Sequence, residues 1–387
     1  MFEAKVGTSI LEDAKAAGAE AAAAAAVDDA KVAFVYCDCG YDVDAVVAGV
    51  EEALPGVPCL GNTSFGSVVA PAGNVGDGTP FVGVMVFAGD ELVVGCAGVD
   101  RAGVDCPVTA GADLAKAAME AAGKDVAPDY FYMAASPAEE EFYLKGISSV
   151  VGRIPFFGGS AADNEIAGKW KLYCGDQSFA DGCVVAFFYN APTMTNVFTG
   201  AYRETDDFGV ITKVVNNRTL AEIDGVPARD KYQAWMGVDD EAVTEGNLLS
   251  TSITSPLGVK DRLGDLVAIR HPMNGNADHT INCGNNLAEK TCVIRMEASV
   301  DELIASVPNT IEALKEKMPG EPKAYLLVHC GGRKAGIGDR LGEVVEAAQA
   351  ACGDVPFLME FTFGEYGFES DNNNTCGGLM LSFTGFC

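Results

Sequence analysis

The chain has 387 residues, of which 49% are hydrophobic, and 26 basic against 55 acidic residues give it a net charge of −29. This is enough apolar material for two or three packed domains, and such an acidic surface repels nucleic-acid phosphates and anionic lipid headgroups. No stretch approaches the roughly 20 apolar residues that cross a bilayer, and the start lacks a signal-peptide pattern, so we expect a cytoplasmic protein.

Helix and strand patterns alternate along the first half of the chain in an order that occurs twice. The first copy has a helix at 11–26, a strand at 31–36, a helix at 42–53, a strand and turn at 58–66, and strands at 80–88 and 91–97. The second copy has a helix at 109–122, a strand at 129–133, a helix at 138–150, a strand and turn at 154–163, and strands at 182–189 and 194–201. The pair of strands within 80–97 is expected to be antiparallel.

A third copy follows near the end of the chain. It has a helix at 300–317, a strand at 324–328, a helix at 338–351, a strand at 355–361 and a last strand at 378–384. Strands that alternate with helices in this way predict crossover connections and a partly parallel sheet. We therefore predict an α/β (mixed α+β) fold with mixed sheets and flanking helices. Strands 31–36, 129–133 and 324–328 should be buried and have equivalent neighbours.

Residues 204–298 fit none of the three copies. They are rich in turn residues, such as Asn216-Asn217 and Asn274-Gly275-Asn276, and carry one predicted helix at 228–237. The polar stretch from Tyr202 to Asp207 interrupts the apolar pattern just before this region. We therefore predict two domains, residues 1–203 and residues 204–387.

Thirteen cysteines are many for a cytoplasmic protein, but no C-x-x-C pair occurs and the number is odd. Disulfide frameworks are typical of short secreted chains, so we expect mostly reduced thiols that act as small buried apolar side chains. A less favoured alternative gathers Cys37, Cys39 and Cys59 around a metal. Three scattered histidines give no zinc spacing, so no metal site is predicted, and any cofactor remains unknown.

Several short motifs occur in an order and spacing that resemble the FIST family, over about residues 32–385. They are Gly61–Gly66 (GNTSFG), Phe157–Asp163 (FGGSAAD), Thr219–Ala228 (TLAEIDGVPA) with Tyr232, His329–Arg333 (HCGGR), Phe361–Gly367 (FTFGEYG) and Asn373–Thr375 (NNT). Asn373 stands where the family often has a histidine, so a role that rests on that histidine does not carry over.

The resemblance implies an intracellular sensory protein for signal transduction, with a FIST N-like domain over 1–203 and a FIST C-like domain over 204–387. Family members are thought to bind small ligands, amino acids among them. No kinase, cyclase or methyl-accepting region follows the sensory part, so we expect a separate signalling partner protein. Neither nucleic acid nor membrane is expected as a partner.

Two predicted turns offer ligand-binding groups at the carboxyl ends of strands, where α/β sheets tend to bind ligands. The first supplies Asn62, Thr63 and Ser64, and the second supplies Gly158, Gly159, Ser160 and Asp163. Paired glycines let the backbone approach a ligand or another strand closely. The alternative is a polar turn that satisfies its own backbone. Neither turn is a phosphate-binding loop, because the G-x-x-x-x-G-K-[ST] pattern is absent.

A third group of candidate residues belongs to the last copy. Arg333 could hold a carboxylate and Glu365 an ammonium group, which together suit a zwitterion such as an amino acid. Cys330 should lie in the same crevice, with its thiol acidified by Arg333, and Asn374 or Thr375 should face it. Alternatively, the arginine and the glutamate form a structural ion pair.

We expect a ligand-binding sensor without a catalytic step. One alternative is an enzyme that uses the Cys330/Arg333/Glu365 crevice, and another is a protein-interaction module. A nucleophilic pair of Cys330 with His329 is disfavoured, because neighbouring residues on a strand point to opposite faces.

Overall fold

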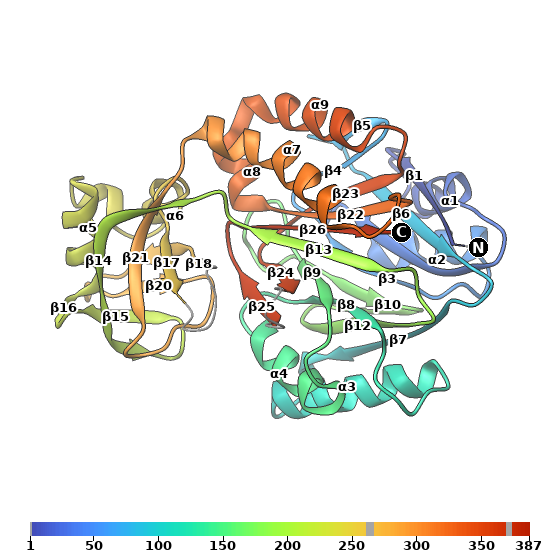
Figure 1. Ribbon diagram of the computed structural model, residues 1–387, viewed down its shortest axis with the longest axis horizontal. Coiled ribbons are helices and arrows are strands. Elements are labelled where there is room, and N and C mark those ends of the chain that lie inside the picture. The colour runs from blue at the N-terminus through green and yellow to red at the C-terminus, as the bar shows by residue number, and fades with distance from the viewer. Residues whose placement is uncertain (1, 261–266, 369–373) are drawn as a thin grey trace.

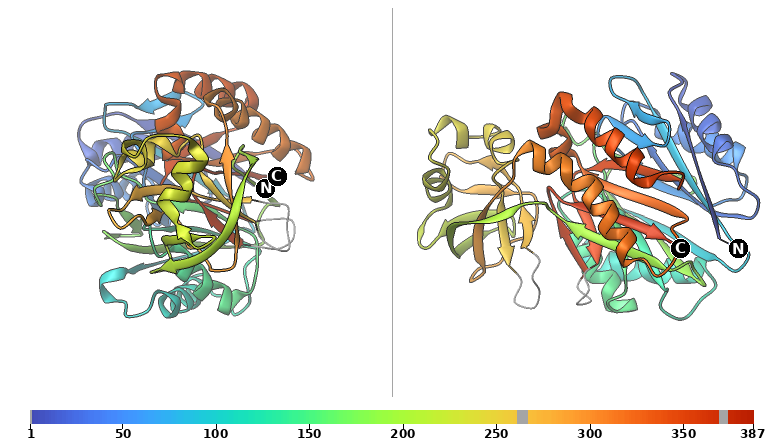
Figure 2. Two further views of the ribbon diagram at one scale, coloured as in Figure 1. Left: turned by 90° about the vertical axis from the view of Figure 1, so that its left-hand side faces the viewer. Right: turned by 45° about the horizontal axis from the view of Figure 1, so that its top comes forward.

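The computed structural model describes residues 2–260, 267–368 and 374–387 (Figures 1 and 2). Three α/β units with outward-facing helices form one body, and a β-rich insertion lies to one side of it. In Figure 1, α1 and α2 lie at the right of this body, α3 and α4 at the bottom, and α7 and α9 at the top. No helix in the described part of the chain is long and apolar enough to cross a membrane.

The three units share one order of elements. Unit 1 contains β1 (Glu3–Ser9), α1 (Ala14–Ala24), β2 (Ala30–Cys37), α2 (Val43–Ala53), β3 (Cys59–Thr63), β4 (Ser67–Ala70), β5 (Gly73–Gly76) and β6 (Val82–Ala88). Unit 2 contains β7 (Val93–Asp100), α3 (Pro107–Ala121), β8 (Tyr130–Ala135), α4 (Glu140–Val151), β9 (Phe156–Ser160), β10 (Leu172–Cys174), β11 (Gln177–Phe179) and β12 (Gly182–Tyr189). Unit 3 contains β13 (Met194–Thr199), α7 (Val300–Lys317), β22 (Ala324–Cys330), α8 (Gly331–Ile337), α9 (Leu341–Cys352), β23 (Phe357–Thr362), β24 (Glu365–Phe368), β25 (Asn374–Gly377) and β26 (Leu381–Phe386).

The central strands of the units have equivalent neighbours, which confirms the predicted threefold repeat. Strands β2, β8 and β22 run parallel to β3, β9 and β23 respectively. They run antiparallel to β6, β12 and β26. All three are buried, as expected for strands that are covered by helices on one face and by the other units on the other.

In each unit, a β-hairpin also pairs with the sheet of another unit. The β4–β5 hairpin of unit 1 pairs with β23, the β10–β11 hairpin of unit 2 pairs with β3, and the β24–β25 hairpin of unit 3 pairs with β9. The expected antiparallel pairing of 80–88 with 91–97 is wrong. Strand β6 stays in the sheet of unit 1, whereas β7 is an edge strand of unit 2 and pairs with β12, because the chain passes from one unit to the next between them.

Helix ends and helix contacts follow from the local sequence. Asp13 caps α1, and Ser299 forms a capping box with Glu302 at the start of α7. Small residues let helices of one unit approach closely: a Cβ at Gly18 would lie 2.2 Å from the Val46 carbonyl oxygen, and one at Gly146 would lie 2.0 Å from that of Val108. The glycine-containing faces of these helices are therefore their packing faces.

The insertion leaves unit 3 after β13 and returns before α7. It contains β14 (Arg203–Val215), β15 (Thr219–Ile223), β16 (Val226–Pro227), α5 (Ala228–Met236), α6 (Asn247–Thr251), β17 (Leu257–Lys260), β18 (Val267–Arg270), β19 (Pro272–Gly275), β20 (Ile281–Cys283) and β21 (Cys292–Glu297). Its strands follow the order β18-β17-β21-β14-β15-β20-β19, with β16 beside β15. The predicted helix at 228–237 is α5. The division of the chain at residue 203 stays a prediction.

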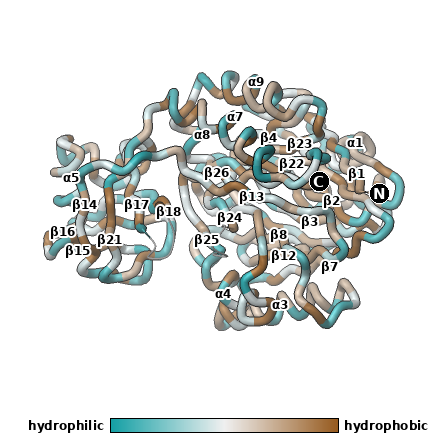
Figure 3. Tube along the Cα trace, viewed as in Figure 1, coloured by the Kyte–Doolittle hydropathy of each residue, from teal (hydrophilic) through white to brown (hydrophobic). Residues whose placement is uncertain are grey.

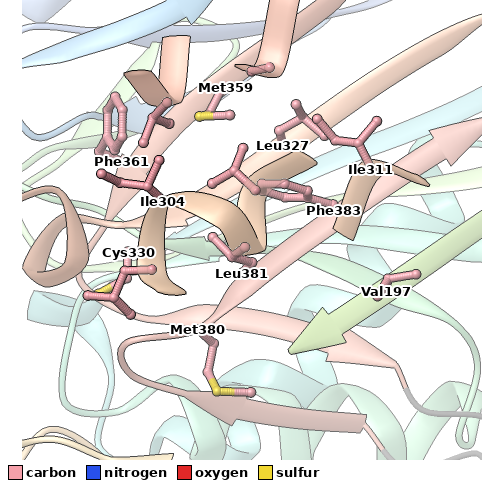
Figure 4. Close-up of a cluster of buried hydrophobic side chains, with 14 of the residues drawn as sticks. Val197, Ile304, Ile311, Leu327, Cys330, Met359, Phe361, Met380, Leu381 and Phe383 are labelled. Atoms are coloured by element: carbon pink, nitrogen blue, oxygen red, sulfur yellow. The ribbon is translucent and has the colours of Figure 1, made fainter. Parts of the chain in front are cut away.

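The inner faces of the three units meet in one aromatic core. Phe34, Tyr132, Phe157 and Phe386 pack there with edge-to-face geometry between several of the rings. A second core fills the space between the unit 3 sheet and helices α7 and α9 (Figure 4). Figure 3 shows hydrophobic residues concentrated along the central strands, as this packing requires.

The cysteines are distributed over all parts of the fold. Seven of the thirteen are buried, namely Cys37, Cys59, Cys183, Cys283, Cys330, Cys352 and Cys376. The alternative of a Cys37/Cys39/Cys59 metal site is wrong, because Cys59 begins β3 opposite Ala33 whereas Cys37 lies opposite Thr63 at the other end. In the described part of the chain, no group of three or more His, Cys, Asp or Glu residues could hold a metal ion.

We expect the native protein to carry thirteen reactive thiols after denaturation without reductant, because every cysteine is free in the structure. Thiol titration in denaturant, on protein purified under an inert atmosphere, measures this number. Eleven or fewer thiols would reveal a disulfide and contradict the prediction.

Candidate functional site

The carboxyl ends of β3, β9 and β23 meet where the three units join, and backbone hydrogen bonds link them. The Ala162 N–H donates to the Thr63 carbonyl at 2.9 Å, and the Ser160 N–H donates to the Gly364 carbonyl at 2.7 Å. The Phe65 N–H donates to the Phe361 carbonyl at 2.9 Å. The structure therefore brings together the segments 61–66, 157–163 and 361–367, which lie far apart in the sequence.

The side chains of the first predicted turn are fully buried and have protein partners. The Asn62 amide donates to Glu360 Oε2 at 2.7 Å and accepts from the Tyr132 hydroxyl at 3.0 Å. Thr63 Oγ1 accepts from the Lys171 N–H at 3.0 Å. Ser64 Oγ donates to the Ser67 carbonyl at 2.8 Å. These hydrogen bonds hold unit 1 against units 2 and 3. The alternative interpretation, a polar turn whose groups hydrogen-bond to the protein itself, therefore describes this segment better than a ligand-binding turn.

The second predicted turn has a similar structural role. The Asp163 carboxylate is buried and accepts from the backbone N–H groups of Glu165, Ala167 and Lys169, which fixes the following loop. Gly158 has a φ of 135°, and a Cβ there would lie 1.9 Å from the Met133 carbonyl oxygen. Its neighbour Gly159 likewise lies against β24. The glycines thus allow strands, rather than a ligand, to approach. Ser160 Oγ lies 2.6 Å from the Tyr366 hydroxyl.

Arg333 does not line an open crevice, contrary to expectation. It lies in α8 and is fully buried, with its guanidinium donating to the carbonyls of Gly200 at 2.6 Å, Leu303 at 3.1 Å and Leu379 at 3.4 Å. It also bonds the Ser306 hydroxyl. Burial lowers the pKa of this guanidinium. Its two terminal nitrogens are occupied by the protein, because α7 and the segments around Gly200 and Leu379 pack against it, which a motif alone does not reveal.

Glu365 and Cys330 are buried close to Arg333 (Figure 4 shows Cys330 among apolar side chains). The Glu365 carboxyl accepts from Thr362 Oγ1 at 2.9 Å and from the Met380 N–H at 2.8 Å, and burial raises its pKa to about 8. Burial, and then Glu365, raise the pKa of the Cys330 thiol, so the expected acidification by Arg333 is wrong. A protonated thiol is a poor nucleophile.

An open cavity of about 320 Å³ lies where α4 and β25 of the body meet the insertion, and we call it the α4–β25 pocket. Its lining residues are Glu141, Leu144, Lys145, Ser148, Arg153, Arg270, Asn286, Asn374, Thr375 and Cys376. The predicted residues Asn374 and Thr375 thus line a pocket without Arg333 or Glu365. Both polar atoms of the Asn374 amide are buried and have no partner within the described part of the chain. Asn373 lies outside the described residues.

The charges around the pocket favour an anion. Among the described residues that line it, Lys145, Arg153 and Arg270 are cationic and Glu141 is the one carboxylate, whereas the chain as a whole is strongly acidic. The Arg270 guanidinium donates to the carbonyls of Asn286 at 2.8 Å and Cys376 at 3.3 Å. It therefore joins the insertion to the β24–β25 hairpin at the pocket wall.

Two successive carboxylates in the first turn of α4 meet Arg218 of the insertion behind the pocket. Arg218 Nη2 lies 3.1 Å from Glu140 Oε2 and 2.5 Å from Glu141 Oε2. The Asn286 N–H donates to the other Glu141 oxygen at 2.9 Å. Burial and the neighbouring Glu141 raise the pKa of Glu140 to about 7, and Arg218 opposes this shift. The Asn285 amide donates to Glu140 Oε1 at 3.4 Å.

Sequence reasoning missed most of the lining of this pocket. Glu141 and Lys145 come from the predicted helix at 138–150 and Arg153 from the turn after it, and Arg270 and Asn286 come from the region that fits no repeat. The acidic pair Glu140-Glu141 at a predicted helix start was the one available signal. A larger cavity of about 620 Å³ lies beside α3, where Cys106 and Asp113 are among its lining residues, and it contains none of the predicted residues.

Comparison with solved structures gives only remote similarity. Cyanuric acid hydrolase from A. caulinodans matches with a TM-score of 0.38 and 10% identity, over 100% of this chain and 99% of that one. PurL from T. maritima, complexed with ADP, matches with a TM-score of 0.25 and 11% identity, over 99% of this chain and 71% of that one. A comparison with curated proteins gives no match.

Comparison with family models is more informative. The FIST N domain model matches residues 31–226, and the FIST C domain model matches residues 228–367. Together they cover nearly the whole chain, including the motifs at 61–66, 157–163 and 361–367. The chain therefore belongs to the FIST family of sensory domains.

Proposed function

We propose that this protein is a cytoplasmic sensor that binds a small carboxylate-bearing ligand in the α4–β25 pocket, without catalysis, and signals through a separate partner protein. Asn374 carries the proposal, because its amide donor and acceptor are both buried and without a partner in the described residues. Burying such groups is unfavourable unless something hydrogen-bonds them. A ligand inside the pocket would satisfy both atoms.

An amino acid fits the polarity of the pocket. Its carboxylate would lie against Lys145, Arg153 and Arg270, with charge-assisted hydrogen bonds stronger than neutral ones. Its ammonium group would approach Glu141 or the Asn374 Oδ1 atom. The volume of about 320 Å³ is at the lower end of the range for small-molecule sites. These features support a compact zwitterion over a large cofactor.

A panel of the twenty amino acids, their deaminated carboxylic acids, the matching decarboxylated amines and common metabolites should identify binders by thermal shift, followed by calorimetric titration. We expect amino acids to raise the melting temperature more than the matching amines do, because three cations face the pocket. Mass spectrometry of the native purified protein tests independently for a co-purifying small molecule.

Lys145→Gln should weaken the affinity for a carboxylate ligand about tenfold, or about 1.4 kcal/mol, because one charge-assisted contact is lost. Lys116→Gln is the matched control, since this lysine is exposed on α3 and pairs with Asp113 away from the pocket. If no compound binds the wild-type protein, or if both variants bind as well as wild type, the proposed site is wrong.

A further inference from the structure

The insertion is attached to the body by two different kinds of contact. Toward α7 and α8 its buried contacts are apolar, since Ile253, Ile269, Ile294 and Met296 belong to the unit 3 core, and the ion pair of Arg203 with Glu302 on this side is exposed. A Cβ at Gly336 in α8 would lie 2.5 Å from Ile253 Cγ2, which shows how closely this side packs. Toward α4 of unit 2 the contacts are charged. Figure 1 places α8 above and α4 below the junction.

The charged contacts on the α4 side centre on one residue, Arg218. Arg218 is only 16% exposed, donates a hydrogen bond to Glu141 and forms an ion pair with Glu140 of α4. Its remaining donors reach the Gly284 carbonyl and, at 3.3 Å, Asn286 Oδ1, so it also fixes the loop that follows β20. The guanidinium thus fastens this loop to α4. Neither Glu140 nor Arg218 lines the pocket, but Glu141 and Asn286 do.

We infer that Arg218 is a positioning residue whose clamp on Glu140 and Glu141 holds the insertion against α4, and that ligand binding in the α4–β25 pocket tightens this clamp. The second half of the inference rests on the proposed function. Lys145 and Ser148 belong to α4, whereas Arg270 and Asn286 belong to the insertion. A ligand that touches both sides binds the closed junction better than an opened one and so shifts the population toward it.

The two kinds of contact differ in how easily they open. The apolar contacts with unit 3 should stay closed, and the charged contacts with α4 should open more readily. Apolar packing against unit 3 is lost only when a buried surface is exposed to water, which is strongly unfavourable. The charged groups on the α4 side are largely buried and become solvated when they separate, and this solvation offsets the loss of the ion pairs, so opening there is easier. The insertion would therefore pivot about its apolar contacts with unit 3. Its position relative to α4 would then depend on whether a ligand occupies the pocket.

Hydrogen exchange of the whole ligand-free chain tests the clamp. The Asn286 amide is a direct reporter, because its N–H donates to Glu141. Arg218→Gln should speed exchange at 284–286 and in the first turn of α4 about tenfold, with the unit 3 core unaffected. Arg295→Gln is the matched control: Arg295 is 17% exposed and pairs with Asp207 inside the insertion. Equal effects of the two variants, or no effect of Arg218→Gln, would overturn the clamp.

Two further variants test the clamp even if Arg218→Gln does not fold. Arg218→Lys keeps the charge but loses the forked geometry, so it should give an intermediate effect. Glu141→Gln removes one carboxylate from the α4 side and should also speed exchange at Asn286. If Arg218→Gln does not fold, these two variants decide: normal exchange at Asn286 in both overturns the clamp.

L-glutamate is the probe for coupling, with binding measured by calorimetry on the same samples. Glutamate should slow exchange at 284–286 at least about threefold in the wild type and less in Arg218→Gln. Binding without slower exchange would overturn the coupling but leave the proposed function intact. If neither glutamate nor any other panel compound binds, the proposed function and the coupling both fail, and the ligand-free experiment alone judges the clamp.

Discussion

Arg333→Ala should lower the free energy of unfolding by about 3–5 kcal/mol, the scale for breaking a buried charged network. The guanidinium is fully buried and donates to three carbonyls and one hydroxyl from the β13–β14 connection, α7 and the turn between β25 and β26. Alanine would leave these acceptors unpaired and create a cavity between α7 and α8. Urea unfolding followed by circular dichroism measures the effect.

Two further variants distinguish this role from a general effect of charge. Arg333→Lys should also destabilise strongly, because one ammonium cannot reach all four acceptors. Arg340→Ala should lower the unfolding midpoint far less, since Arg340 is exposed and pairs with Asp301 and Glu343 at the surface. If Arg333→Ala kept wild-type stability but lost ligand binding, Arg333 would be a ligand residue and our description of its surroundings would be wrong.

Glu360→Gln should change how the stability depends on pH. Glu360 lies in the central core, where Oε2 accepts from Asn62 and Oε1 has no partner in the described residues. Burial raises the pKa of Glu360 from 4.5 to about 8. The folded protein thus keeps a proton that the unfolded chain releases near its ordinary pKa. The resulting stability is complete below about pH 4.5 and is lost as the pH rises through about 8.

Glutamine has no proton to release at this position. The stability of the wild type relative to Glu360→Gln should therefore fall by about 1.4 kcal/mol per pH unit between about pH 5.5 and 7.5. Glu140 and Glu365 also have raised pKa values, but both proteins contain them. Their contributions to the pH dependence of stability therefore cancel in the difference. Urea unfolding at several pH values measures the slope.

Glu316→Gln is the control, because Glu316 is exposed on α7. Its unfolding profile should run parallel to the wild type over the whole pH range. A constant difference between Glu360→Gln and the wild type would mean that Glu360 is charged in the folded protein, with an unseen cation or water beside it.

The sequence alone predicted the repeated order of elements because each buried strand is a short apolar run bounded by Gly, Pro or Asp. The predicted strands 31–36 and 324–328 therefore fall within β2 and β22, and 129–133 overlaps β8. The hairpin exchange between units was not predictable, since pairing of β4 with β23 depends on contacts between residues almost three hundred positions apart. Adjacency in sequence suggested that β6 pairs with β7, and the change of unit between them prevented it.

The candidate site was predictable only in part. The strand-end motifs were predicted to bind a ligand and instead lie where the units meet, because polarity alone does not distinguish residues that bind a ligand from residues that bind another unit. Asn62, Asp163 and Arg333 have protein partners, whereas the Asn374 amide has none among the described residues. The cations of the pocket come from α4, the turn after it and the insertion, and only the folded chain brings these segments together.

Hydrogen exchange with and without a saturating panel compound tests most directly whether the α4–β25 pocket is the ligand site. Bound compound should slow exchange in the C-terminal half of α4, at 267–270 and at 374–377, because these segments supply Ser148, Arg270 and Asn374 to the pocket. Slowing confined to other segments, such as those around Cys106 beside α3, would place the ligand elsewhere and contradict the account.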